Sequence, residues 1–132
     1  MNTEAIIQGG VHTNERHDSA HKHVTGRAEY IDDMMEPVGT LHAYLGLSDQ
    51  PHGTITKLDL TDVRQAPGVV GVLTAEDIPG HNDVSPTGKH DDPVFAGTLV
   101  EFHGQPIFAV IGKTRDAARR AASLAKVEYA KQ

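Results

Sequence analysis

The sequence predicts an α+β domain, built as a mixed β-sheet with two helices packed on one face. Two observations lead to this fold class. A strand–helix–strand order occurs twice, over residues 54–73 and 107–129. Hydrophobic residues make up 38% of the chain but aromatic residues only 5%, so aliphatic side chains and alanine must form the core. The length of 132 residues is typical of a single domain.

The first residues differ in composition from the rest of the chain. Residues 1–22 are polar, rich in Gly, Asn, Glu and His, and show almost no apolar periodicity. Such a segment buries too little surface to order itself, so we interpret residues 1–22 as a polar N-terminal arm. The folded domain is expected to span residues 23–132.

The first expected strand covers residues 41–47, where every second residue is apolar, a pattern typical of a half-buried strand. These residues are Leu41, Ala43, Leu45 and Leu47. Turn residues follow over 48–53, and a second strand is expected over 54–60. A short helix over Thr61–Ala66 should stop at Pro67–Gly68.

The continuous apolar run of residues 69–73 favours a strand covered on both faces. One helical turn over 74–77 and a polar loop over 81–93 are expected next. Residues 99–102 and 107–111 then form a strand pair. Thr114 caps a helix from Arg115 to about Lys126, and a short strand closes the domain. Small side chains recur on this helix and would let it lie close to a sheet: Ala118, Ala121, Ala122 and Ala125.

Composition excludes several classes of function. Twelve Lys and Arg against eighteen Asp and Glu give a net charge of −6, which leaves no basic surplus for nucleic acid. The absence of cysteine excludes disulfides, thiolate metal sites and iron–sulphur ligation within this chain. The longest apolar run, residues 107–111, is far too short for a membrane helix, and no secretory signal is present. A cytoplasmic protein is therefore expected.

A histidine-rich segment is the densest candidate for a site. On a helix, His17 and His21 would lie one turn apart and could present two imidazoles to a metal, whereas on a strand His21 and His23 would share a face. No third ligand is evident from the sequence. A solvated polar segment is the simpler interpretation.

Other candidate groups have equally simple explanations. The paired carboxylates Asp32–Asp33 and Asp91–Asp92 fit turns and capping better than acid–base catalysis, which needs two carboxyls in different environments. Gln105 lies between Gly104 and Pro106 and could donate to a ligand carbonyl, although a turn amide serving loop backbone groups is commoner. No nucleophile elbow, phosphate loop or dinucleotide motif is present.

Several segments, taken in order, resemble the large subunit of the xanthine dehydrogenase and aldehyde oxidase family. Residues 25–33 resemble its "TGxAxYxDD" opening, and residues 66–80 its "PGVVxVLTAxDIPG" segment. The remaining similar pieces are Leu41–Ala43, Gly104–Pro106, Ala109–Val110 and Ala117–Tyr129. The leader over 16–24 resembles bacterial enzymes whose molybdenum-binding subunit is a separate polypeptide.

This resemblance implies the a/b hammerhead domain at the N-terminus of the molybdenum-binding subunit. In such enzymes the molybdopterin and the catalytic glutamate belong to later segments, and the iron–sulphur clusters and FAD to other domains or chains. The resemblance therefore assigns no catalytic, cofactor-binding or metal-binding residue to this chain. The parent reaction would be hydroxylation of a purine, and this segment alone is expected to be inactive.

Three hypotheses follow from these patterns. The leading one is a structural scaffold domain, whose partners are the remainder of the molybdenum-binding subunit and the iron–sulphur/FAD subunit. The alternative is a stand-alone metal- or small-molecule-binding module that uses His17, His21 and His23. A third is an interaction protein that uses the loop 81–93. A domain made to pack inside a large subunit should expose an apolar face when isolated, so the isolated fragment is expected to form a homodimer.

Overall fold

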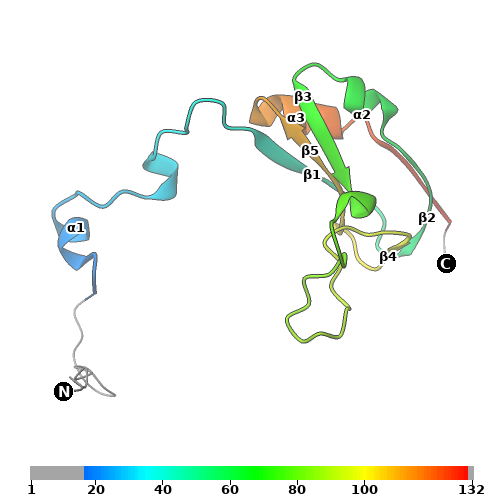
Figure 1. Ribbon diagram of the computed structural model, residues 1–132, viewed down its shortest axis with the longest axis horizontal. Coiled ribbons are helices and arrows are strands. Elements are labelled where there is room, and N and C mark those ends of the chain that lie inside the picture. Colours follow the sequence, from blue (N-terminus) through cyan, green and yellow to red (C-terminus); the bar gives the residue numbers. More distant parts are fainter. Residues whose placement is uncertain (1–16, 131–132) are drawn as a thin grey trace, which may run out of the picture. The chain divides into compact units, whose positions relative to one another are not determined.

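The computed structural model describes residues 17–130, which form parts of two compact units. One unit covers residues 1–37 and the other residues 38–132. The larger unit contains six strands and two α-helices, shown in Figure 1, and confirms the α+β class. Positions 1–16 of the predicted polar arm lie outside the described residues.

The smaller unit contains one short helix and one helical turn. The α-helix α1 spans Ala20–Val24, and the 3-10 turn η1 spans Ile31–Asp33. Thr25 follows α1 directly, and its hydroxyl donates to the His21 carbonyl at 2.6 Å. No described residue of this unit from His17 to Pro37 is fully buried. Local hydrogen bonds rather than a core therefore hold it.

The first sheet of the larger unit contains β1 (His42–Leu47), β3 (Val69–Thr74) and β5 (Pro106–Gly112). The strand order is β1-β5-β3, and β5 pairs antiparallel with both neighbours. Because β5 is central, its residues 107–110 are all at most 5% exposed. The predicted covering of the run 69–73 on both faces is wrong, because Val70 and Leu73 of the edge strand β3 are 52% and 43% exposed.

The second sheet contains β2 (Gly53–Asp59), β4 (Leu99–Val100) and β6 (Lys126–Ala130). Its order is β4-β2-β6, again with antiparallel pairs only. The ladder between β2 and β6 is irregular between Ile55 and Lys57, a β-bulge that leaves Thr56 without a directly opposed residue.

The division into two sheets differs from the single mixed sheet that the sequence predicts. Each strand–helix–strand stretch begins in one sheet and ends in the other, since β2 leads through α2 to β3 and β5 leads through α3 to β6. Periodicity identifies strands and helices but not which strands become neighbours. In the described part of the chain all strand pairs are antiparallel, so neither sheet is mixed.

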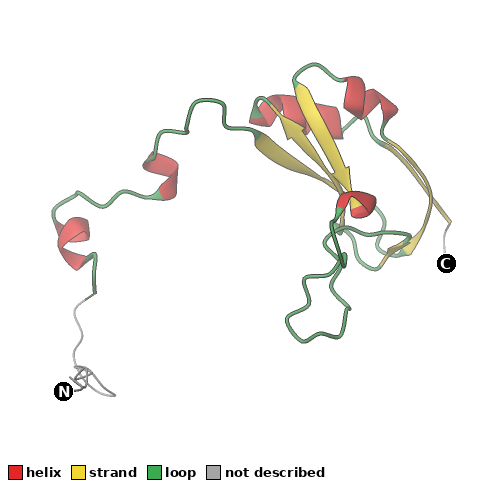
Figure 2. Cartoon of the chain, in the orientation of Figure 1, coloured by secondary structure: helices red, strands yellow, loops and turns green. Residues whose placement is uncertain are grey.

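Two helices pack on one side of the first sheet. The α-helix α2 spans Thr61–Gln65 and buries Val63, and α3 spans Arg115–Ala122. Figure 2 shows α3 lying behind the strands of this sheet. Thr114 caps α3 as predicted, because its hydroxyl accepts a hydrogen bond from the Ala117 amide at 3.1 Å. The helix ends at Ala122, four residues before the predicted end, because Lys126 already belongs to β6.

Small residues set the distance between α3 and the sheet. A Cβ added at Gly112 would lie 3.0 Å from the Cβ of Ala118, and a Cβ added at Gly46 would fall inside the ring of Phe108. Three members of the predicted stripe, Ala118, Ala121 and Ala122, are buried on this helix together with Ala117, and the fourth, Ala125, lies beyond the end of the helix. The core therefore combines close backbone approach at small residues with buried aliphatic side chains and Phe108. Its buried members are Leu60, Val63, Val72, Ala96, Val100, Ile107, Phe108, Val110, Ala118, Ala121 and Ala122.

Candidate docking surface

The face of the first sheet opposite α3 is apolar and open. The registers place Leu45, Ala109 and Leu73 in one row across the three strands, because β5 pairs with β1 and β3 at Ala109. The neighbouring row contains Ala43, Ile111 and Gly71. None of these six residues carries a charge. We call this set of six residues the open face.

The exposed fractions of these side chains show how much of the open face is covered. Leu45 is 45% exposed and Leu73 is 43% exposed, whereas Ala109 between them is only 5% exposed. The two leucines therefore shield the central alanine but are not themselves covered. Two more apolar side chains on the same edge strands, Leu47 and Val70, are 53% and 52% exposed. A contiguous apolar surface of this kind marks an interaction site.

The sequence predicts one apolar face on β1, but the structure shows that this face points outward. Tyr44 and Gly46 lie on the side of α3, and Leu45 between them points to the other side. Packing explains this orientation, because the Phe108 ring occupies the space directly above Gly46. A leucine on that side would collide with the ring. The strand therefore turns its larger apolar side chains away from the helix.

The described histidines of the smaller unit do not adopt the arrangement that the alternative hypothesis of a metal-binding module requires. The helix α1 begins at Ala20, so His17 precedes it and does not share a helical face with His21. Instead the His17 and His23 rings lie 6.0 Å apart, and the Tyr30 hydroxyl lies 3.2 Å from Nδ1 of His23. All three histidines are exposed. Within residues 17–130, no three acidic or histidine side chains converge in a way that could hold a metal.

The two carboxylate pairs organise turns. The Asp33 carboxylate accepts a hydrogen bond from the Tyr30 amide at 3.1 Å and so caps η1. Asp91 accepts from the Ser85 hydroxyl at 3.1 Å, and the Asp92 carbonyl accepts from the Val84 amide at 2.8 Å. These contacts agree with the capping and turn functions that the sequence favours.

Gln105 has the structural function that the sequence favours. Its side chain is buried, at 2% exposure for the residue, and its Oε1 accepts from the Glu101 amide at 2.7 Å. Its backbone carbonyl accepts from the Ser48 amide at 2.9 Å, and the Ser48 carbonyl accepts from the Gly104 amide at the same distance. Gln105 therefore joins two turns at one end of the first sheet.

Sequence reasoning missed Asp83, which organises the loop 81–93. Its carboxylate accepts from the Ser85 amide at 3.2 Å and lies 2.9 Å from Nδ1 of His90. Desolvation favours a higher pKa for Asp83, but the hydrogen bonds from Ser85, His90 and Asp92 outweigh it, so the pKa lies below the ordinary value. His90 takes a left-handed backbone conformation with φ of 58°. The Asp-x-Ser spacing, typical of an Asx turn, is the signal that could have identified it.

Two further findings limit which kinds of site the described residues can form. No helix within residues 17–130 is long and apolar enough to cross a membrane. In the same residues every buried side-chain nitrogen or oxygen has a hydrogen-bond partner. No unsatisfied buried polar group therefore points to a missing ligand. The described residues form a two-sheet α+β domain whose most prominent surface is the open face.

Comparison with known proteins identifies the family. Residues 25–132 match the family model for the aldehyde oxidase and xanthine dehydrogenase a/b hammerhead domain. This chain belongs to that family. It is 42% identical to the xanthine dehydrogenase of Oryza sativa over 113 residues, which are 86% of this chain and 8% of the relative. The chain spans less than a tenth of the length of the curated relatives that it matches.

Solved structures give the same fold. The aldehyde oxidoreductase from Desulfovibrio desulfuricans matches with a TM-score of 0.75 and 29% identity, over 87% of this chain and 14% of that one. Two structures of CO dehydrogenase also match, the reconstituted enzyme from Oligotropha carboxidovorans and the Cu,Mo enzyme. Each has a TM-score of 0.76 and 28% identity over 89% of this chain and 15% of that one. The predicted hammerhead domain and the family resemblance are thereby confirmed.

Proposed function

We propose that this chain is a non-catalytic scaffold domain of the molybdenum-binding subunit of a xanthine dehydrogenase. The open face carries this proposal, because an isolated globular domain rarely leaves a row such as Leu45–Ala109–Leu73 uncovered. The occupant is the remainder of the molybdenum-binding subunit. The relatives support this choice, because the segment that matches this chain is a small part of a much longer polypeptide.

The proposed reaction of the parent enzyme is hydroxylation of a purine carbon, with electrons passing through iron–sulphur clusters and FAD to NAD. Xanthine dehydrogenases support this substrate class, because identity reaches 42% with them, and aldehyde oxidases follow at up to 40%. Molybdopterin, the clusters and FAD would be held by other segments or by the iron–sulphur/FAD subunit. In this proposal no residue of this chain is catalytic or binds a cofactor.

The proposed domain boundary lies at residue 23, with residues 1–22 as an arm. The family match from residue 25 supports a boundary near this position, whereas the two compact units of the structure divide after residue 37. A cytoplasmic location is part of the same proposal. When isolated from its partners, the chain is proposed to form a homodimer through the open face, because that face then has no other apolar surface to cover it.

The proposal is tested by placing an affinity tag at the N-terminus of the chromosomal copy and purifying the product under native conditions. We expect the tagged product to contain or carry the remaining molybdenum-binding segments, together with molybdenum and xanthine-dependent NAD reduction. The 132-residue chain purified alone should show no such activity. A tagged chain that purifies without any molybdenum-binding segment, or a lone chain that turns over xanthine, would contradict the proposal.

A further inference from the structure

A groove lies between the second sheet and the end of β3, separate from the open face. It encloses about 740 Å³ and shares no residue with the open face. Apolar residues at its base are buried: Leu60 at 7%, Ala96 at 3% and Ile107 at 1% exposure. The walls come from residues 55–61 on one side and from residues 74–76 on the other. The groove therefore has an apolar base between two backbone segments.

One wall of the groove is a sheet edge. On this side β2 pairs with β4 only at Gly53 and Thr54, and the Ile55 amide then donates to the Thr98 carbonyl at 2.7 Å. Among the strands described, the residues of β2 from Lys57 to Asp59 pair only with β6 on its other side, and the Thr56 hydroxyl donates to the Glu128 carbonyl of β6 at 3.0 Å. An unpaired strand edge is a template for a further strand. Extended peptides bind to such edges through main-chain hydrogen bonds.

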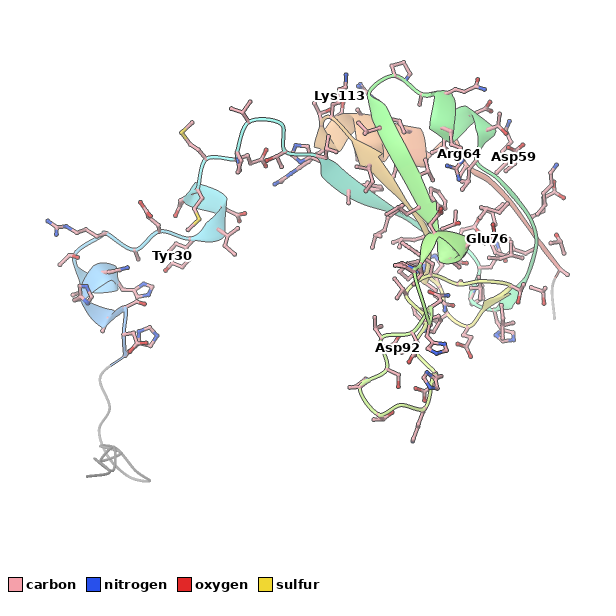
Figure 3. All side chains as sticks on the ribbon, in the orientation of Figure 1. Tyr30, Asp59, Arg64, Glu76, Asp92 and Lys113 are labelled. Carbon is pink, nitrogen blue, oxygen red and sulfur yellow. The ribbon has the colours of Figure 1, made fainter. Side chains whose placement is uncertain are left out.

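The rim of the groove carries charges of both signs. Figure 3 shows Asp59 and Arg64 near α2 and Glu76 on the facing turn η2 (Ala75–Asp77). The hydrogen bond from the Thr61 amide lowers the pKa of Asp59, so this carboxylate is ionised at neutral pH. Arg64 donates to the Val72 carbonyl at 3.3 Å and holds α2 against β3. A polar rim above an apolar base suits an extended segment whose side chains alternate in polarity.

The chain leaves the described domain beside this groove. Ala130 of β6 pairs with Thr54, and Thr54 also pairs with Leu99 of β4. Ala130 is therefore separated from the open edge of β2 only by β2 itself. The four edge residues span about 13 Å, so a short extended segment is enough to occupy them.

We infer that the edge Thr56–Asp59 accepts an additional strand from the remainder of the molybdenum-binding subunit. The added segment has alternating apolar and polar residues, with the apolar ones against Leu60, Ala96 and Ile107. This inference rests on the proposed scaffold function and adds a second, hydrogen-bonded attachment to the apolar docking of the open face. Backbone pairing fixes the register of the attached segment, which an apolar face alone does not.

Two glycines give a matched pair of blocking variants. Gly97 lines the groove and Gly71 lies on the open face, and a Cβ added at either position meets no atom within 4 Å. Neither has a positive backbone φ. Gly97→Trp therefore fills the groove, and Gly71→Trp disturbs the open face, without a clash at the Cβ.

The test is amide hydrogen exchange on the natively purified tagged protein. In the wild type, the amides of residues 56–59 that do not bond to β6 should exchange about tenfold more slowly than in Gly97→Trp. Gly71→Trp should leave their protection unchanged in whatever complex remains. Thermal unfolding checks that both variants fold. If Gly97→Trp does not fold, the exchange rates of the edge amides in the wild type alone decide whether a strand is added.

The outcomes separate this inference from the scaffold proposal. If the molybdenum-binding segments are present but the edge amides exchange as freely as those of the loop 81–93, the strand addition is wrong and the scaffold function stands. Equal protection in Gly97→Trp and in the wild type also overturns the strand addition. If no molybdenum-binding segment is recovered, both proposals fail.

Discussion

The two faces of the first sheet use the same kinds of residue in opposite ways. On the side of α3, glycine and alanine bring backbones so close that Gly46 lies directly under the Phe108 ring. On the open face, Leu45 and Leu73 remain nearly half exposed. This difference shows that side-chain size alone does not identify the face of a strand that packs in the core. On this sheet the closest backbone approach occurs at the smallest residues, and Leu45 and Leu73 lie on the uncovered face.

Removal of the Phe108 ring should give the largest loss of stability and so sharpen this comparison. Phe108 is 2% exposed and belongs to the core cluster, so Phe108→Ala should cost about 3–5 kcal/mol of unfolding free energy. Leu45→Ala on the open face should cost less than about 1 kcal/mol. Chemical denaturation of the two variants measures the difference. Equal losses would show that the open face is not an uncovered surface.

The glycines test the same contrast without removing any side chain. Gly46→Ala should cost about 1–3 kcal/mol or more, because the new methyl group meets the Phe108 ring. Gly71→Ala is the matched control, since its methyl group meets open space, and it should be neutral or stabilising by about 0.5 kcal/mol. Thermal unfolding of both variants measures this. A neutral Gly46→Ala would contradict the close approach.

Charges on the open face should change association more than stability. Sedimentation of the isolated chain is expected to show a dimer, and the double variant Leu45→Lys with Leu73→Lys should be monomeric because lysine opposes burial of that face. The unfolding free energy should change by only about 0.5 kcal/mol per site. Val84→Lys is a suitable control, because Val84 is exposed in the loop 81–93. A monomeric wild type would contradict the proposed homodimer.

The smallest effect is expected where β3 ends at η2. The Asp77 carboxylate accepts hydrogen bonds from the Thr74 amide and hydroxyl at 2.8 and 2.9 Å, and these lower its pKa in the folded chain. Its contribution to stability is therefore present above the pKa of the unfolded chain and is lost as the pH falls through the lower folded value.

Asp77→Asn should accordingly show a weaker decrease in melting temperature than the wild type between about pH 5 and pH 2. Glu76→Gln is the control, because it removes a charge from the same turn and leaves both Thr74 contacts in place. Parallel melting curves for wild type and Asp77→Asn would show that this contact does not contribute.

The local elements could be predicted from the sequence, because each depends on nearby residues. The Thr114 cap, the alanine stripe of α3 and the apolar run of β5 follow from spacing alone. The division into two sheets could not be predicted, because strand pairing depends on contacts such as Leu45 with Ala109 that join distant parts of the chain. The outward direction of the Leu45 side chain could not be predicted for a similar reason, since it depends on the position of the Phe108 ring.

The candidate surface was only partly predictable. The sequence and the family resemblance indicate a domain that should expose an apolar face, but they do not say which strands form it. No residue pattern predicts the groove beside Thr56–Asp59, because it arises where β4 is too short to cover β2. The histidine cluster had a clear signal but no matching geometry, because α1 begins after His17.

The position of β5 in the centre of its sheet has a consequence during synthesis. Leu45 of β1 cannot pair with the central strand until Ala109 has been synthesised. At ribosomal rates of about 5–20 residues per second, the nascent leucines of β1 stay without their central strand for about 3–13 s. That interval is long compared with hydrophobic collapse, so these leucines stay open to non-native apolar contacts until the central strand has been made.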